Sequence, residues 1–488
     1  MAYEKEAIVV VTSATAGKLD IPSSIKGIPV EVRPATDLEQ FSHQNPAWFS
    51  QLADHRPELR GSMLAEFSPS GAGVRADISA TVASAQQKKP EITYTPAGVP
   101  LDPVSGTIPI TCHVSPDAGW PTLMDFVSGT REQLKVSMYD FTSSHILSLF
   151  QTKIANAKLQ MTLDDPPKNR TADQTDPETV QDLRNTLAAR FTSAWALVRS
   201  SPEADTWIYP SAYHIKVMVR DKNTVWLSSG NLNNSNQPPI DPIGNPQPTD
   251  QTTAKRSDRD WHVVIQSPAL ATTFEAYLDH DFQQATLHKP GGTLATRSLE
   301  VEEMPELSSI RAVAIGDFTF APPKLISEQV TITPLLTPDP GVYQAAMLDL
   351  INSVRASLYI QLQYIHPTNA AANAKFTDLI DAVAAQINAG KDVKIILSEY
   401  QILNGGLEAL QAAGVNLDNV KIQNNVHNKG FVFDNKKVVV SSMNWSGEGV
   451  LSNRDAGVII ENATAAGYYA GIFLDDWNHH SAQKIVMP

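Results

Sequence analysis

The stretch that decides the fold occurs twice, first as Tyr213-His-Ile-Lys-Val-Met-Val-Arg220, Asp221-Lys-Asn-Thr224 and Val225-Trp-Leu-Ser-Ser-Gly-Asn231. Its second copy reads Val426-His-Asn-Lys-Gly-Phe-Val-Phe433, Asp434-Asn-Lys-Lys437 and Val438-Val-Val-Ser-Ser-Met-Asn444. In both copies two apolar runs flank a tetrapeptide rich in turn-forming residues. The sequence therefore predicts two β-hairpins of one design.

Both hairpins fit one template: His, any residue, Lys, four residues, Asp, seven residues, Ser, any residue, Asn. The matching positions are His214, Lys216, Asp221, Ser229 and Asn231, and then His427, Lys429, Asp434, Ser442 and Asn444. From ordinary residue frequencies, one chance match in a chain of this length has a probability of roughly one in ten thousand. The doubled template therefore indicates a duplicated functional unit.

The spacing of the template has a physical logic. Residues two apart on a strand point to the same side, so the His and Lys share a face, as do the Ser and Asn on the returning strand. Two such hairpins would surround a tetrahedral phosphodiester with two imidazoles, two ammonium groups and two carboxamides, which suits its negative charge. The template aspartates, Asp221 and Asp434, fall at the turns, so we expect a structural role for them.

The repeat extends beyond the hairpins. Ser115-Pro-Asp-Ala-Gly-Trp120 returns as Thr337-Pro-Asp-Pro-Gly-Val-Tyr343, each time before a helical segment. Two pairs of apolar runs follow, which we expect to be strands: 134–141 with 357–364, and 158–163 with 392–397. Strand, helix and strand at this spacing are typical of an α/β sheet.

These repeats predict the domain organisation. Residues 1–105 have no counterpart in the second half and form an extension or small domain of unknown role. The two halves span 106–289 and 324–488, and an acidic linker joins them at 290–323. The segment Asn233–Lys255 has five prolines and no apolar periodicity, so we expect a long loop at the rim of the site rather than an element.

The doubled template resembles the paired HKD motifs of the phospholipase D superfamily, over about residues 106 to 488. This resemblance implies duplicated α/β/α domains with mixed β-sheets and an active site at the interface of the halves. It also implies a carboxylate downstream of each motif Asn that orients a histidine, and aligned strands place these at Asp260 and Asp455. We expect Ser229 and Ser442 to support the site.

The resemblance further implies a reaction through a phosphohistidine, with neither metal nor cofactor. His214 would attack phosphorus, and His427 would act as acid and then base. The expected activity is hydrolysis of a phospholipid or related phosphodiester, or transfer of its phosphatidyl group. A nuclease acting on DNA or RNA is the alternative, and a catalytically inactive phosphate-binding module is a third hypothesis.

Composition bears on the partner. The 488 residues carry a net charge of −14, which disfavours a basic track for nucleic acid, although Lys421, Lys429, Lys436 and Lys437 face only Asp434 locally. The single cysteine, Cys112, is expected to be a buried, inert thiol. The other ten histidines, His262 among them, are expected to be surface or structural residues.

The sequence also predicts location and assembly. No apolar run is long enough to span a bilayer, and the N-terminus lacks the pattern of a signal peptide, which favours a cytoplasmic protein or a mature exported form. Membrane-surface contact would be transient. Because both motifs lie in one chain, we expect a monomer.

Overall fold

The computed structural model describes residues 96–164, 173–196, 212–287, 316–339, 342–367 and 373–482, together with three N-terminal strands. The chain divides into two compact units, of which the larger spans residues 90–292 and 311–485. In the other unit, β3 (Ile28–Pro34) pairs in parallel with β1 (Ile8–Thr12) and antiparallel with β2 (Ser24–Ile25). The rest of the predicted extension to residue 95, and the linker up to residue 315, lie outside the described residues.

The larger unit is built on one mixed sheet of 14 strands, which confirms the expected α/β class. The first half contributes β4 (Val104–Ser115), β5 (Gln133–Met138), β6 (Lys158–Asp164), β7 (Phe191–Ala196), β8 (Lys216–Arg220), β9 (Thr224–Ser228) and β10 (Asp260–Gln266). The second contributes β11 (Lys324–Thr337), β12 (Ser357–Leu362), β13 (Asp392–Leu397), β14 (Val420–Ile422), β15 (Lys429–Phe433), β16 (Lys437–Ser441) and β17 (Asp455–Glu461).

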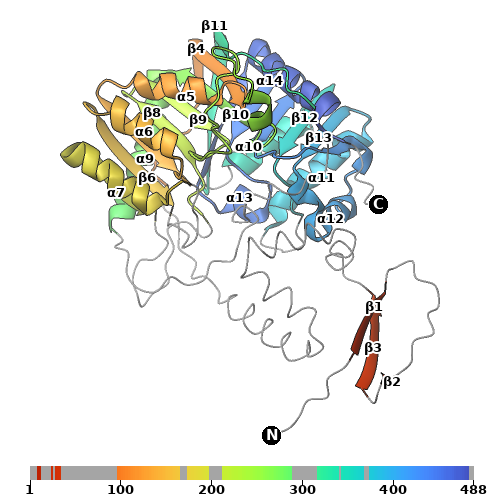
Figure 1. Cartoon of the computed structure of the whole chain (residues 1–488). Helices are drawn as coiled ribbons and strands as arrows, with labels where there is room; N and C mark the ends of the chain where they lie inside the picture. The colour runs from red at the N-terminus through yellow and green to blue at the C-terminus, as the bar shows by residue number, and fades with distance from the viewer. Residues whose placement is uncertain are drawn as a thin grey trace. The chain divides into compact units, whose positions relative to one another are not determined.

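The strand order shows the duplication directly. It runs β7-β6-β5-β8-β9-β10-β4 through the first half and then β11-β17-β16-β15-β12-β13-β14 through the second. The second half therefore repeats the order of the first in reverse. The two meet where β4 pairs antiparallel with β11, from Val104 opposite Ile332 to Cys112 opposite Lys324 (Figure 1). The halves thus share one continuous sheet.

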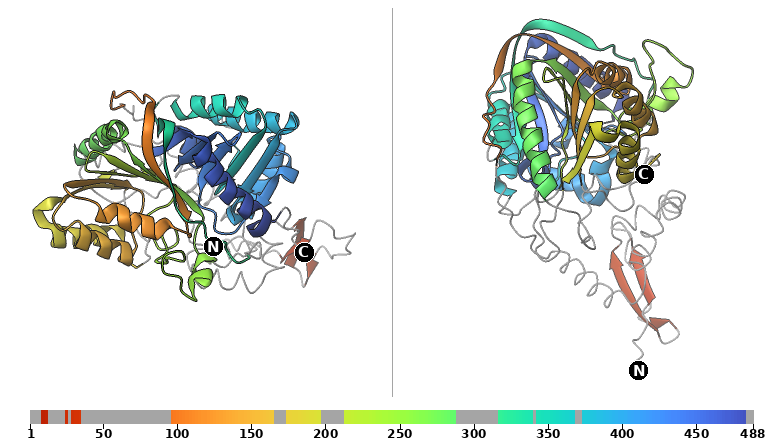
Figure 2. Two further views of the ribbon diagram at one scale, coloured as in Figure 1. Left: turned by 90° about the horizontal axis from the view of Figure 1, so that it is seen from above. Right: turned by 90° about the vertical axis from the view of Figure 1, so that its left-hand side faces the viewer.

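Helices cover both faces of the sheet (Figure 2). In the first half, α5 (Gly119–Ser128), α6 (Ser144–Lys153) and α7 (Asp176–Leu187) bury one apolar cluster with the strands, and α9 (Pro268–Leu287) covers the other face. In the second half the corresponding helices are α10 (Val342–Asn352), α11 (Ala374–Asn388) and α12 (Gly406–Ala412) on one face and α14 (Ala463–Asp475) on the other. Shorter helices add to these: α13 (Gly447–Leu451), η1 (Ala188–Arg190), η4 (Glu399–Gly405), η5 (Leu417–Asn419) and η6 (Asp476–His480).

One apolar cluster is common to both halves. It contains Phe274 of α9, Tyr469 of α14 and the buried faces of the central strands. Trp261 of β10 stacks beside Tyr469, and a Cβ on Gly430 of β15 would lie only 2.3 Å from the Trp261 ring. Glycine at position 430 therefore lets an indole from one half close against a strand of the other.

Two buried arginines also tie the halves together. Arg259 donates to Asp476 near the C-terminus, at 2.9 and 3.0 Å, and Arg454 donates to Asp281 of α9 at 2.7 Å. Breaking such a buried pair leaves an uncompensated charge, which costs about 3–5 kcal/mol. Since Arg259 and Arg454 directly precede β10 and β17, the ion pairs position the first residue of each strand.

The Asn233–Lys255 segment differs from the prediction. Residues 250–254 form a short helix, α8, so the prediction of a loop without any element is wrong there. Ile240 and Ala254 are buried against Phe318, which explains the helix: its apolar side has a partner from a distant part of the chain. Residues 243–249 are exposed. The segment is thus packed against the protein on both sides of an exposed tip, residues 243–249.

Candidate active site

The motif residues gather at the ends of the hairpin strands. His214 and His427 lie two residues before β8 and β15, while Asn231 and Asn444 lie three residues after β9 and β16. The prediction that these residues belong to the strands is therefore wrong at the strand ends. The physical reason is local: the lysine ammonium groups bind the carbonyls of His214 and His427, at 2.7 and 2.6 Å, in place of a neighbouring strand.

Each histidine pairs with a carboxylate of the opposite half. His214 Nδ1 lies 2.7 Å from Asp455 Oδ1, and His427 Nδ1 lies 3.0 Å from Asp260 Oδ1. The sequence left open which histidine each carboxylate orients, and the structure pairs them crosswise. A carboxylate at Nδ1 keeps the proton on that nitrogen and leaves Nε2 as the reactive atom. The pairing therefore makes each half incomplete without the other.

The lysines contact the reactive nitrogens. Lys216 Nζ lies 2.6 Å from His214 Nε2, and Lys429 Nζ lies 3.0 Å from His427 Nε2. An ammonium group can only donate, so each Nε2 accepts. Both imidazoles are thus arranged as neutral rings with a lone pair on Nε2, the form required of a nucleophile or a base.

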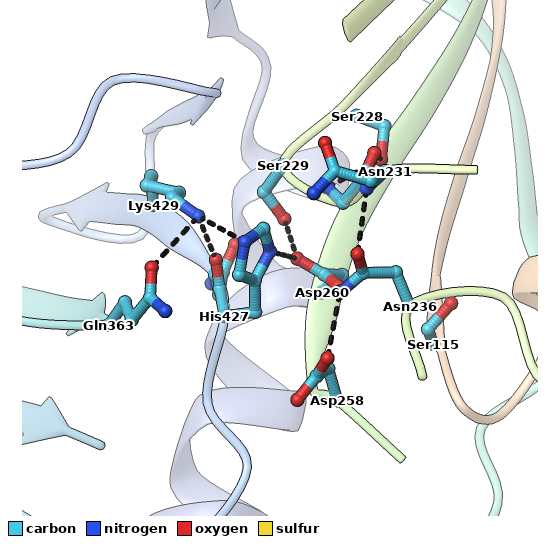
Figure 3. Close-up of polar contacts among 12 residues, drawn as sticks. Ser115, Ser228, Ser229, Asn231, Asn236, Asp258, Asp260, Gln363, His427 and Lys429 are labelled. Atoms are coloured by element: carbon cyan, nitrogen blue, oxygen red, sulfur yellow. Dashed lines mark hydrogen bonds and ion pairs between the residues drawn. The ribbon is translucent and has the colours of Figure 1, made fainter. Parts of the chain in front are cut away.

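Burial and charge act together on His427. Burial and, after it, the Lys429 ammonium lower the pKa of His427 to about 4, against the opposing effect of Asp260. Burial alone would raise the pKa of Asp260, but the charge and hydrogen bond of His427 outweigh this and hold it below its ordinary value. Figure 3 shows His427 in contact with Asp260. With these pKa shifts, the pair at neutral pH is an ionised carboxylate and a neutral imidazole.

The motif serines contact the carboxylates rather than the histidines. Ser229 Oγ donates to Asp260 Oδ1 and Ser442 Oγ donates to Asp455 Oδ1, both at 2.6 Å. Each serine thus fixes the carboxylate of its own half. That carboxylate in turn contacts Nδ1 of the histidine in the other half. The predicted supporting serines and aspartates therefore lie in two matched three-residue chains.

The motif carboxamides have uncommitted polar atoms. Asn231 Oδ1 and both polar atoms of the Asn444 side chain are buried without a hydrogen-bond partner within the described part of the protein. Leaving a buried polar group unpaired costs about 1–3 kcal/mol, so such atoms at a reactive site indicate a ligand position. The Asn444 amide can supply donors to a phosphate oxygen.

The turn aspartates lie away from the histidines. The Asp221 carboxylate accepts the backbone N–H groups of residues 131–133, and Asp434 accepts those of residues 355–357. Both residues have a left-handed φ of 51°, which Asp tolerates better than most residues. Their contacts fix the starts of β5 and β12 against the hairpin turns.

The two copies differ at one contact of the lysines. In the first half, Lys216 lies 5.1 Å from the ring centre of Tyr139, whose ring also meets His214 edge-on. The corresponding position in the second half is Gln363, whose Oε1 lies 3.5 Å from Lys429 Nζ. The His214 side chain is fully buried and that of His427 is 11% exposed. The site is therefore symmetric in its motif but not in its surroundings.

Sequence reasoning missed these neighbours and one other residue. Asn236 lies in the inserted segment, is 1% exposed, and donates to Asp260 Oδ2 at 2.9 Å (Figure 3). The available signal was the unusual run of asparagines after the first motif, at positions 231, 233, 234 and 236. Tyr139 and Gln363 carried no signal, because each lies just after an ordinary buried strand.

Two other residue groups have structural contacts. His262 is buried with its ring nitrogens 2.8 Å from Ser115 Oγ and 2.6 Å from Ser228 Oγ, which fits the expected structural role. Lys437 pairs with Glu461 at 3.0 Å, so the prediction that the local lysines face only Asp434 is wrong. The carboxylate comes from β17, which pairs with β16 and places Glu461 opposite Lys437.

The thiol of Cys112 is buried as expected, and burial raises its pKa to about 12. In the described residues, no group of three or more His, Cys, Asp or Glu side chains has the arrangement of a metal site. No helix in this part of the chain is both long and apolar enough to cross a membrane.

Comparisons with known sequences find one family model and one protein that are similar to parts of this chain. Residues 347–477 match the family model described as cardiolipin synthase, PLD-like domain. A phospholipase D from Rickettsia bellii is 28% identical over 138 residues, which are 28% of this chain and 62% of that protein's length. The chain thus matches less than two thirds of this relative.

One solved structure shares the fold of the larger unit, and a second is similar over a shorter stretch. Phosphatidylserine synthase from Haemophilus influenzae Rd KW20 superposes with a TM-score of 0.51 at 13% identity, over 77% of this chain and 88% of its own. Nuc from Salmonella typhimurium, a phospholipase D family member, gives a TM-score of 0.26 at 20% identity, over 32% of this chain and 99% of its own. The chain is therefore similar to the phospholipase D superfamily in its doubled motif and over residues 347–477, and it shares the fold of the synthase.

Proposed function

We propose that the protein is a phosphodiesterase or phosphatidyltransferase that acts on a phospholipid through a phosphohistidine at His214. The observation that carries this proposal is the crossed pair of His–Asp contacts, which leaves two Nε2 lone pairs beside two ammonium groups. The names of the similar proteins, a phospholipase D and a phosphatidylserine synthase, support a lipid phosphodiester as substrate.

In the first step, His214 Nε2 attacks phosphorus. The N–P bond forms as the P–O bond to the leaving alcohol breaks, and His427 gives that alcohol a proton. Lys216 and Lys429 move from the imidazoles onto the non-bridging oxygens and neutralise their charge. Since the resting His427 is neutral, it must first gain a proton, and the bound phosphate anion favours that gain.

In the second step, His427 is a base. It takes the proton of a water molecule or an acceptor alcohol, whose oxygen attacks phosphorus as the N–P bond breaks. His214 is regenerated as a neutral imidazole, and Asp455 has held its Nδ1 proton throughout. Water as acceptor yields hydrolysis, and an alcohol yields transfer.

The assignment of the two histidines has a direct test. Bis-p-nitrophenyl phosphate has a leaving group good enough to depart without an acid, so His427→Asn should release about one equivalent of p-nitrophenolate and then stop. Mass spectrometry should find the phosphoryl adduct on the peptide that contains His214. His214→Asn, the matched control, should show neither burst nor adduct. A burst in His214→Asn but not in His427→Asn would reverse the roles.

The substrate class has a separate test. Purified wild-type protein would be given phosphatidylcholine and phosphatidylglycerol vesicles with an added alcohol, and single-stranded DNA in parallel. Release of head group or formation of phosphatidyl alcohol, without DNA cleavage, is the expected result. DNA cleavage without lipid turnover would identify a nuclease. Binding of inorganic phosphate without turnover of any diester would identify an inactive phosphate-binding module.

A further inference from the structure

Asn236 of the inserted segment connects three parts of the site (Figure 3). Its side-chain Nδ2 donates to Asp260 Oδ2 at 2.9 Å and to Asp258 Oδ2 at 2.8 Å. Its Oδ1 accepts the backbone N–H of the motif residue Asn231 at 2.9 Å. One buried carboxamide thus separates two carboxylates and fixes the backbone beside a phosphate ligand.

The position of Asn236 is itself constrained. Its backbone N–H donates to Asn233 Oδ1 at 2.9 Å, which closes a local turn. A Cβ on Gly230 would lie 2.6 Å from Asp260 Oδ2 and 2.9 Å from Asn236 Cβ, so only glycine leaves room for this contact. The second half has Met443 at the position that corresponds to Gly230. The arrangement is therefore specific to the first half.

Among its described residues, the second half has no equivalent donor. Gly449 stands five residues after Asn444, as Asn236 does after Asn231, and a Cβ there would already lie 2.4 Å from the Asn444 carbonyl oxygen. Asp455 Oδ2 is buried without a hydrogen-bond partner among the described residues. The two carboxylates thus differ: Asp260 has a donor on each oxygen, and Asp455 has donors only on Oδ1.

This difference has a chemical consequence. A donor on the second oxygen draws charge from the carboxylate and weakens its hold on the imidazole N–H, in line with the longer contact of 3.0 Å at His427 against 2.7 Å at His214. His214 faces the carboxylate with the uncommitted oxygen, at the shorter distance. The weaker hold of Asp260 on the His427 N–H suits His427 to give up a proton once it is protonated.

We propose that Asn236 is a positioning residue that holds Asp260 for His427 and thereby gives the two motif histidines unlike roles. This proposal rests on the proposed function, since it assigns the roles within that reaction. Under this proposal the inserted segment helps to position a residue of the site and does not only line its rim.

The test uses two substitutions with different predicted losses. Asn236→Asp keeps an acceptor for the Asn231 N–H but replaces the donor at Asp260 with a third carboxylate. Asn236→Leu removes donor and acceptor at similar volume. Asn234→Ala is the matched control, because Asn234 lies in the same segment and donates to Asp173 instead of the site.

The first readout is independent of substrate. The ring signals of His427 are followed by NMR against pH in the free protein and assigned by their loss in His427→Asn. The pH midpoint of the His427 titration should rise by about half a unit to one unit in Asn236→Leu and further in Asn236→Asp. The reason is that Asp260, without the donor, holds more negative charge beside His427 than in the wild type. Asn234→Ala should match wild type. A wild-type midpoint in both Asn236 variants would overturn the proposal.

The second readout is kinetic. In both Asn236 variants kcat should fall by about 10-fold or more with KM within about twofold, and the acid limb of kcat/KM should move up with the NMR midpoint. If circular dichroism shows that Asn236→Leu does not fold, the test uses Asn236→Asp, measured at a reduced temperature. If the midpoint moves while no diester is turned over even by wild type, the proposed function fails and the positioning contact stands.

Discussion

At the scale of single residues, each motif histidine depends on a carboxylate far away in the chain. Asp455 is 241 positions from His214, and Asp260 is 167 positions from His427. A carboxylate at Nδ1 fixes the tautomer and stabilises the imidazolium that forms during reaction. Loss of a carboxylate should therefore impair the histidine of the opposite half, and not the one in its own hairpin.

The crossed pairing predicts which variants share a defect. Asp455→Asn should behave like His214→Asn and slow the p-nitrophenolate burst, by about 10² to 10⁴-fold. Asp260→Asn should behave like His427→Asn and preserve the burst while slowing turnover. Stopped-flow absorbance separates the two phases. Defects grouped by hairpin, with Asp260→Asn resembling His214→Asn, would contradict the pairing.

A buried histidine outside the reaction predicts a pH-dependent stability. Burial lowers the pKa of His262 to about 4, whereas the unfolded residue titrates near about 6.5. As the pH falls from about 6.5 to about 4, the unfolded chain binds a proton here that the folded chain does not, so the free energy of unfolding falls. The loss from this residue reaches roughly 3 kcal/mol at and below pH 4 and is absent above pH 6.5.

His262→Gln should remove that contribution. Urea unfolding between pH 6.5 and 4 should show a slope of free energy against pH that is shallower than wild type by up to about 1.4 kcal/mol per pH unit. The absolute stability can fall as well, because Ser115 and Ser228 lose a partner, but that loss is the same at each pH. An unchanged slope would show that His262 titrates normally in the folded protein.

At the scale of elements, the segment between β9 and β10 has two parts. Residues near Asn236 are buried against the site, and α8 is anchored by Ala254, while residues 243–249 between them are exposed. Exposed loops at the rim of a site often influence which substrates bind. Asn236 contacts the Asp260 carboxylate, so a deletion limited to the tip leaves that contact in place.

Shortening the tip should therefore affect substrate preference. Replacement of residues 242–249 by a Gly/Ser turn, with Asn236 and α8 kept, should change the ratio of activity on phosphatidylcholine vesicles to activity on bis-p-nitrophenyl phosphate by about tenfold. The direction reports whether the tip aids or hinders the lipid. Equal changes in both activities would make the tip a connector.

At the scale of the whole molecule, a protein of net charge −14 concentrates cations at one internal point. Lys216 and Lys429 are buried, and each lies beside an imidazole nitrogen, where the proposed reaction places a phosphate oxygen. Two ammonium groups and the motif carboxamides can supply the positive charge that the reaction requires.

Because these side chains can supply the positive charge, we predict that metal chelators leave the activity intact. Turnover of bis-p-nitrophenyl phosphate should remain within about twofold after dialysis against EDTA, whereas Lys429→Met should lower it by about 10²-fold or more. Lys436→Met, two turn residues beyond the strand, is the control and should be near wild type. Activity lost to EDTA and restored by a divalent ion would contradict the assignment.

The sequence by itself determined the duplication, the α/β class and the residues of both motifs. This was possible because hairpin periodicity and motif spacing are local properties: His214, Lys216 and Asn231 lie within 18 positions of one another. Asp260 and Asp455 could be found by aligning the two copies. The turn positions of Asp221 and Asp434 also followed from spacing alone.

Only the tertiary structure decided how the copies combine. The single 14-stranded sheet and the crossed His–Asp pairs depend on the antiparallel pairing of β4 with β11, which no local pattern encodes. The Asn236 contact depends on how the inserted segment packs against the start of β10. The helix α8 likewise forms because Phe318, more than 60 positions away, covers its apolar side. Such contacts depend on which distant surfaces become buried together, and that is settled by packing of the whole chain rather than by periodicity within a segment.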